Sequence, residues 1–277
     1  MEHTDALPAQ SGVHLVEWAC EFAGTAALLV GGLSAVCFDF GPGTPLHAVP
    51  HSARLLITGL LFAGTGSLIA ISPPGRRSGA HINPVVTLAF WTQRKVHPHD
   101  VFGYVIAQCT GAILGAAIVR LLWQHKASVL DVGATTPGRG LSDPEAALVE
   151  ALMTAILIIT ILFMTSSART ARWTPLVLWL VIATLVWQGA PYTGTSLNPA
   201  RSLGPALVAP LWSHFEVYVA GPLLGGAVAV AVFAAFRDRH VLTAKLFHDP
   251  AYPSTLATSL PTAPGPDAAR RLSGSAG

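Results

Sequence analysis

The stretch Thr193–Arg201, written TGTSLNPAR, and its partner Ser78–Val85, written SGAHINPV, decide how this chain folds. Asn83 and Asn198 are the only asparagines in the sequence, and each is followed by a proline within an otherwise apolar region. Asparagine is a favoured N-cap, and proline suits the first helical position because its missing N–H is not needed there. Each Asn-Pro pair is therefore predicted to begin a short helix.

The composition indicates a membrane protein. Hydrophobic residues make up 52% of the chain and charged residues 11%, and the mean hydropathy is +0.54. A soluble domain carries about 25% charged residues, so this chain lacks the polar surface that a soluble fold needs. The net charge of +2 is too small to indicate nucleic acid as a partner. The expected surroundings are a lipid bilayer.

Six apolar runs have about the length that a helix needs to cross a bilayer, roughly 20 residues for a ~30 Å hydrocarbon layer. We place these spans at 14–37, 53–71, 101–123, 145–166, 174–190 and 216–236. The segments that begin at the Asn-Pro pairs, 84–93 and 199–209, each reach about 15 Å as helices, so they enter the membrane without crossing it.

The two halves of the chain repeat each other. HINPVVTL in the first half matches SLNPARSL in the second, Glu21 matches Glu150, and the run that begins at Tyr104 matches the run that begins at Tyr218. Because each half holds three spans, the second copy enters the membrane upside down relative to the first. The predicted fold is an all-α membrane protein with six transmembrane helices and two re-entrant half-helices in an inverted 3+3 repeat.

This organisation predicts one channel domain and two polar ends. The domain covers 14–240, with a first repeat at 14–123 and a second at 145–236; residues 1–13 form an N-terminal segment, and 248–277 a disordered tail rich in Pro, Ser, Thr, Ala and Gly. Most Lys and Arg residues lie on one side of the membrane when both termini are cytoplasmic, which favours that orientation. The absence of a targeting segment and the high Ala, Gly and Pro content suggest a bacterial inner membrane.

The motifs resemble those of the aquaporin, or major intrinsic protein, family. The resemblance runs from Glu17 to about Arg237 and rests on GAHINPVVTL, SLNPARSLGP, the two span glutamates and an AQxxGA run (Ala107, Gln108, Gly111, Ala112). It implies six tilted helices plus two half-helices, a homotetramer with one pore in each subunit, water and small neutral solutes as the permeants, and no cofactor.

The resemblance also implies which residues form the middle of the pore. The two motifs, Asn83-Pro84-Val85 and Asn198-Pro199-Ala200, would meet back to back, and each asparagine amide would donate to passing water. Both half-helix dipoles would direct their positive ends at this point, a barrier to protons and cations that is described for aquaporin-type pores. Val85 stands where the family usually has alanine, and we expect it to pack at the junction of the half-helices and to narrow or shift it slightly.

Four further residues are expected to form the outer constriction. By resemblance Arg201 lines it, and ungapped spacing from the motifs adds Ala63, Val186 and Thr195. Water-selective relatives carry phenylalanine and histidine where this chain has Ala63 and Val186, so we expect a wider and less polar filter. Ser202, which follows the arginine, instead fits the water type. The predicted function is passive permeation of water and uncharged solutes such as glycerol or urea, and a strictly water-selective channel is the alternative.

Three buried polar side chains are expected to support the re-entrant loops. By resemblance, Glu21 and Glu150 accept hydrogen bonds from loop N–H groups, and Gln108 packs beside them. His81 is expected to line the inner vestibule. The histidine pairs His97/His99 and His47/His51 lack a third ligand at useful spacing, so no metal site is predicted.

Two other classes of protein remain open. An ion-coupled secondary transporter also uses inverted repeats and broken helices, but it needs a coupling site of paired carboxylates or unwound carbonyls. The third class is a non-conducting membrane scaffold. No GxSxG, HExxH, Walker or GxGxxG motif occurs in a suitable context, so an enzyme is not predicted.

Overall fold

The computed structural model describes residues 12–236, 238–249, 251–252 and 254–257. Within these ranges six helices are long and apolar enough to cross a membrane, which confirms the predicted number of spans. They are α1 (Leu15–Phe40), α2 (His51–Ile71), α5 (Pro98–Trp123), α7 (Asp143–Met164), α9 (Thr174–Thr193) and α11 (Val217–Ala234). The predicted ends fall within about three residues of the observed ones.

Both Asn-Pro pairs begin short helices in the middle of the bundle, α4 (Pro84–Thr92) and α10 (Pro199–Val208). Asn83 and Asn198 are the N-caps, and each side chain accepts a hydrogen bond from backbone N–H groups of the first turn. Smaller helices occupy the connections: η1 (Pro45–Ala48), α3 (Pro73–Ser78), α6 (His125–Val129), η2 (Asp131–Gly133) and α8 (Ala168–Ala171).

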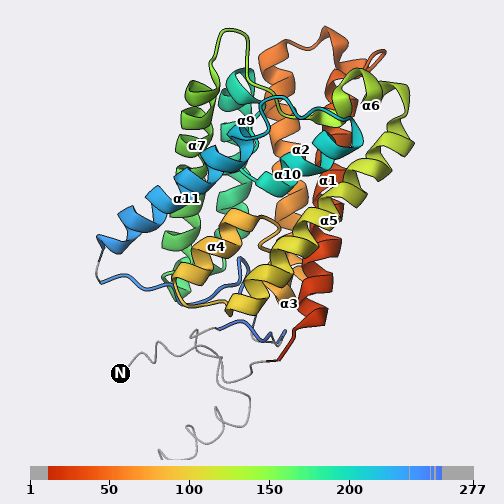
Figure 1. The fold of residues 1–277 in the computed structure, drawn as a ribbon. Coiled ribbons are helices and arrows are strands. Elements are labelled where there is room, and N and C mark those ends of the chain that lie inside the picture. Colours follow the sequence, from red (N-terminus) through yellow and green to blue (C-terminus); the bar gives the residue numbers. More distant parts are fainter. Residues whose placement is uncertain (1–11, 237, 250, 253, 258–277) are drawn as a thin grey trace, which may run out of the picture.

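The packing follows the sequence repeat. Helix α1 packs along α5 in the first half, α7 packs along α11 in the second, and α2 packs on α9 between the halves. The half-helix α10 lies against α5, and α4 lies against both α5 and α11 (Figure 1). The half-helices therefore approach the centre from opposite ends, which places their N-termini close to each other.

Glycines allow the long helices to approach closely. A Cβ added at Gly111 of α5 would collide with the carbonyl oxygen of Phe22, and one added at Gly225 of α11 would collide with that of Ala151. Gly111 and Gly225 occupy corresponding positions in the two repeats. In both, the lack of a side chain lets the backbone of the glycine contact the backbone of the neighbouring helix. Small residues at such crossings are the usual means of packing membrane helices.

The chain beyond α11 differs from the prediction of a disordered tail from residue 248. Leu256 is buried, the N–H of Ala244 donates to the carbonyl of Ala257, and Asp249 pairs with Arg76 at 2.8 Å. This blue segment runs beneath the bundle at the end where α1 and α5 begin (Figure 1). The segment contains three apolar side chains, Leu246, Phe247 and Leu256, that can pack against the bundle. The Pro- and Ser-rich composition on which the prediction rested did not indicate this packing. The rest of the predicted tail, 258–277, and most of the predicted N-terminal segment lie outside the described residues.

Candidate pore

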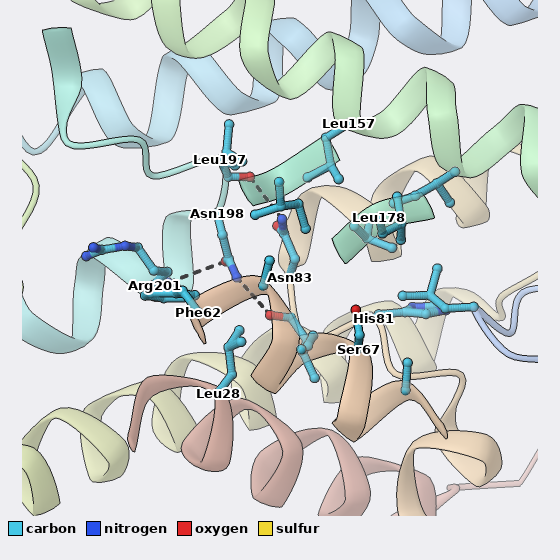
Figure 2. Close-up of a pocket in the computed structure, with 18 of the residues that line it drawn as sticks. Leu28, Phe62, Ser67, His81, Asn83, Leu157, Leu178, Leu197, Asn198 and Arg201 are labelled. Atoms are coloured by element: carbon cyan, nitrogen blue, oxygen red, sulfur yellow. Dashed lines mark hydrogen bonds between the residues drawn. The ribbon is translucent and has the colours of Figure 1, made fainter. Parts of the chain in front are cut away.

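The two motif asparagines bind each other's loop. The Nδ2 of Asn83 donates to the carbonyl of Leu197 at 2.9 Å, and the Nδ2 of Asn198 donates to the carbonyl of Ile82 at 2.8 Å (Figure 2). Each Oδ1 accepts from its own half-helix, from Val85 N–H in one case and from Ala200 N–H in the other. An asparagine amide has two N–H groups, so one N–H on each side chain is left beyond this crosswise pair of bonds.

The loops that lead to the asparagines share an unusual backbone. Ala80 and Ile82 have positive φ values of 53° and 42°, and Thr195 and Leu197, at the same offsets from Asn198, have 52° and 59°. Left-handed backbone is rare for residues other than glycine and uncommon above all for a β-branched residue such as isoleucine. Such strain persists only where surrounding contacts enforce it.

Two buried glutamates supply those contacts. Glu21 of α1 accepts from the backbone N–H groups of His81 and Ile82 at 3.0 and 2.6 Å. Glu150 of α7 accepts from the equivalent N–H groups of Ser196 and Leu197 at 2.8 and 2.9 Å. In each loop the left-handed turns thus direct two consecutive N–H groups at one carboxylate.

Other side chains complete this support. The hydroxyls of Tyr104 and Tyr218 donate to the carbonyls of Ser78 and Thr193, again at matching positions of the two repeats. Gln108 is present in the first repeat only, where its Nε2 donates to Glu21 at 2.8 Å and to Thr87 at 3.0 Å. Gln108 therefore makes a specific hydrogen-bond link, rather than the simple packing that the sequence suggested.

Two cavities meet beside the asparagines. The first, here called the central cavity, has a volume of about 100 Å³ and is lined by Asn83, Asn198, His81, Ala63 and Leu246 among others. The second, the vestibule, has about 650 Å³ and is lined by His51, Val186, Thr195 and neighbours. The residues that line both, and so mark their boundary, are Phe62, Ile182, Ser196, Leu197 and Arg201.

Arg201 is buried at this boundary and held from two directions. Its Nη1 donates to the carbonyl of Gly133 at 2.8 Å, and its guanidinium carbon lies 5.5 Å from the centre of the Phe62 ring (Figure 2). The hydroxyl of Thr135 also bonds Ser202 at 2.7 Å. The connection between α5 and α7 therefore reaches over the start of α10 and fixes the arginine, which the sequence alone did not reveal.

The structure corrects one of the four predicted constriction residues. Phe62, and not Ala63, faces Arg201, while Ala63 is buried along the central cavity. The ungapped count back from Asn83 crosses α3 and the left-handed loop, and the face of α2 cannot be fixed by counting across such an irregular segment. One residue is about 100° of rotation on a helix, so the count selected the neighbouring side chain. Val186 and Thr195 line the vestibule, and Ile182, one turn from Val186, was missed.

Val85 also lies elsewhere than expected. It is buried against α11, where a Cβ added at Gly226 would come within 2.5 Å of the valine Cγ1. It lines neither cavity, whereas the next residue, Val86, lines the central one. The expected narrowing of the pore by Val85 is therefore wrong, because the extra methyl groups occupy the space that glycine leaves in α11.

The C-terminal segment covers part of the central cavity beside His81. His81 is buried, with its Nδ1 3.1 Å from the hydroxyl of Thr87 and its Nε2 2.7 Å from the carbonyl of Ala244. The N–H of Leu246 donates to the carbonyl of Gly79, and the leucine side chain lines the cavity. Burial lowers the pKa of the nearby Lys245, whose ammonium group donates to the carbonyl of Tyr252.

Together these features define a class: a multi-pass membrane protein with a path between two re-entrant half-helices. Comparison with known proteins identifies the family. The sequence model of the major intrinsic protein family matches residues 11–233, and the chain belongs to that family. As a member it is a channel for water or small solutes and not an enzyme.

Individual relatives agree with this assignment. Aquaporin AqpM from Methanothermobacter marburgensis is 33% identical over 223 residues, which cover 76% of this chain and 89% of that protein. Aquaporin-4 from Mus musculus is 37% identical over 161 residues, which cover 57% of this chain and 50% of that protein. The X-ray structure of the aquaglyceroporin from Plasmodium falciparum has a TM-score of 0.66 at 21% identity, covering 80% of this chain and 96% of that one, and supports the fold.

Proposed function

We propose that this channel conducts water and small uncharged solutes of the glycerol and urea type, passively, and excludes protons and ions. The observation that carries the proposal is the crosswise pair of asparagine bonds at the meeting point of two half-helix N-termini. Each Oδ1 is occupied by a helix cap, so the free capacity of both side chains is an N–H donor. A water molecule at this point accepts from the protein.

Charge exclusion follows from the same arrangement. The N-terminus of each half-helix carries a partial positive charge, and both face one point. A cation there would lose its hydration shell and meet donors only, and Arg201 adds a full positive charge at the boundary with the vestibule. A neutral molecule with a hydroxyl or carbonyl oxygen can accept hydrogen bonds from the same donors.

The side chains around Arg201 support different permeation rates for water and for larger solutes. Phe62 keeps one large ring beside Arg201, which limits the bore more than the alanine inferred from the sequence would have done. Ile182 and Val186 on α9 are apolar, so the opposite wall accepts the CH groups of a polyol. We therefore expect water to pass faster than glycerol or urea, with both solutes above the leak of the bilayer.

The assembly and the orientation are also proposals. The family resemblance supports a homotetramer with one pore in each subunit, in a bacterial inner membrane with both termini cytoplasmic. The positive charges of Arg76, Arg94 and Arg169 near one membrane face support that orientation. Cross-linking in native membranes and proteolysis of right-side-out vesicles would test the two statements separately.

The test is stopped-flow light scattering on liposomes that contain the purified protein, with water, urea, glycerol and sorbitol gradients and a pH dye inside. We expect rapid water flux, slower urea and glycerol flux, and proton flux equal to that of empty liposomes. Water flux without urea or glycerol flux would support the strictly water-selective alternative. Solute flux that depended on an imposed ion gradient would support the transporter alternative.

A further inference from the structure

A cluster of histidines lies at the end of the bundle where α1 and α5 begin, away from both cavities. His14 is the N-cap of α1, His97 is the N-cap of α5, and His99 and Asp100 stand in the first turn of α5. None of these four residues lines the central cavity or the vestibule. The cluster therefore has no part in the permeation path described above.

Three of these side chains converge on one point. The Nδ1 of His14 lies 2.7 Å from the Oδ2 of Asp100, and the Nε2 of His99 lies 3.6 Å from the same oxygen. One ligand atom from each of His14, His99 and Asp100 lies within 4.8 Å of the other two. In a tetrahedral site with bonds of about 2.1 Å the ligand atoms stand roughly 3.4 Å apart, so the Nδ1 of His14 and the Oδ2 of Asp100 would separate by several tenths of an ångström to admit the ion.

The carboxylate is already oriented as a metal ligand would be. The Nε1–H of Trp18 donates to the Oδ1 of Asp100 at 2.8 Å, which leaves the Oδ2 directed at the histidines. Ligands of bound metals are held in this manner by a second layer of hydrogen bonds. Asp100 is fully buried, so its charge has few ways of being compensated other than a cation among these side chains.

Several ring nitrogens of the cluster have no hydrogen-bond partner within the described residues. The Nε2 atoms of His14, His97 and His99 are buried and have no hydrogen-bond partner. His14 and His97 are more than nine-tenths buried, and the ring of His97 stacks on that of His99 with centroids 5.1 Å apart. Buried polar atoms in folded proteins are nearly always bonded, so three such nitrogens in one cluster point to a missing partner. The side chain of His99 is 35% exposed, which gives an ion a route from solvent.

We propose that His14, His99 and Asp100 form a binding site for a divalent transition-metal cation of the Zn²⁺ type. Two imidazole nitrogens and one carboxylate oxygen are a donor set that Zn²⁺, Co²⁺ and Ni²⁺ accept, whereas Ca²⁺ and Mg²⁺ prefer oxygen atoms throughout. Water is available for a fourth position. The sequence predicted no metal site because His14 is far from the His97/His99 pair along the chain; only the packing of α1 on α5 supplies the third ligand.

The site would join the start of α1 to the start of α5. Because its ligands must be deprotonated, binding of the metal releases protons. A bound ion stabilises the folded state that contains the site, so the melting temperature rises with the concentration of the ion.

The test uses the full-length protein in detergent, with any affinity tag removed and resident metal stripped by a chelator. Zn²⁺ binding is measured by isothermal titration calorimetry, the melting temperature is followed with and without Zn²⁺, and Co²⁺ binding is followed by its visible absorption. We compare the wild type with His99→Gln, which changes a partly exposed side chain, with His14→Gln, and with His125→Gln on α6 as an exposed control.

We expect one Zn²⁺ per chain, at least a tenfold loss of affinity in His99→Gln and His14→Gln, and no change in His125→Gln. Both the increase in melting temperature and the Co²⁺ spectrum should disappear with the first two variants. If the wild type binds no Zn²⁺, or if all four proteins bind it equally, the cluster is an imidazolium–carboxylate pair and the proposal is wrong. A low yield of folded His14→Gln does not affect this test, because His99→Gln decides it.

Discussion

The guanidinium carbon of Arg201 lies 5.5 Å from the centre of the Phe62 ring, at the boundary between the two cavities. A cation that faces an aromatic ring is attracted to it, and the arginine is also bonded to the carbonyl of Gly133. The pair joins a side chain of α2 to one of α10, and in the proposed channel it would set the bore from both repeats at once.

Replacing Phe62 by alanine should widen the filter. The ring is the largest side chain at the boundary, so we expect glycerol permeability to rise by about tenfold, or roughly 1.4 kcal/mol in the barrier. Water permeability should change less, because water already fits. Swelling assays on liposomes measure both, with Ala63→Gly as the neighbouring control. Equal effects of the two variants would mean that Phe62 does not set the bore.

A histidine in place of Val186 should act in the opposite direction. Val186 lines the vestibule one turn of α9 from Ile182, and it is the smaller of the two side chains. The imidazole adds both bulk and polarity, so we expect the ratio of glycerol to water permeability to fall by several-fold. The same swelling assay provides the measurement. A loss of water flux equal to the loss of glycerol flux would indicate a general blockage instead of a change in selectivity.

The sequence predicted the architecture well because the spans and half-helices depend on local features. Apolar length fixes the six spans, and Asn83 and Asn198 cap helices wherever they occur. It placed Ala63 incorrectly because a helix face cannot be counted across an irregular loop, and it missed Gly133 because a loop carbonyl has no sequence signature. Likewise, the close approach of His14 to His99 and Asp100 depends on packing between segments far apart in the chain.

The buried glutamates that bind the re-entrant loops should contribute more to the free energy of unfolding than an exposed glutamate does. Glu150 accepts from two backbone N–H groups and from the hydroxyl of Thr193, and glutamine would place an NH₂ group among these donors. We expect Glu150→Gln to lower the free energy of unfolding by about 2–4 kcal/mol. Thermal melting in detergent would measure this, with the exposed Glu216→Gln as the control. A melting temperature of Glu150→Gln equal to that of the control would refute the supporting role.

The contact between Val85 and Gly226 can be tested by a pair of substitutions. Gly226→Ala places a Cβ 2.5 Å from the Cγ1 of a valine that is stiff on its helix, so we expect a destabilisation of about 1–3 kcal/mol. Adding Val85→Ala removes that methyl group and should restore most of the loss. Melting of the two single variants and the double variant gives the coupling energy between the sites. Simple additivity would show that the two residues do not share this space.

Leu246 should control how readily molecules leave the central cavity at the end that the C-terminal segment covers. Its side chain lines that cavity, and its N–H holds the segment to the re-entrant loop at Gly79. Alanine shortens the side chain without removing the backbone bond, so we expect Leu246→Ala to raise water and glycerol flux, and Leu246→Phe to lower both. Leu256→Ala removes a buried leucine from the same segment outside the cavity and serves as the control. Opposite changes for the two Leu246 variants, with little change for the control, would show that the side chain itself narrows the path. If alanine and phenylalanine act alike, their effect comes from loosening the segment, and Leu246 does not limit permeation.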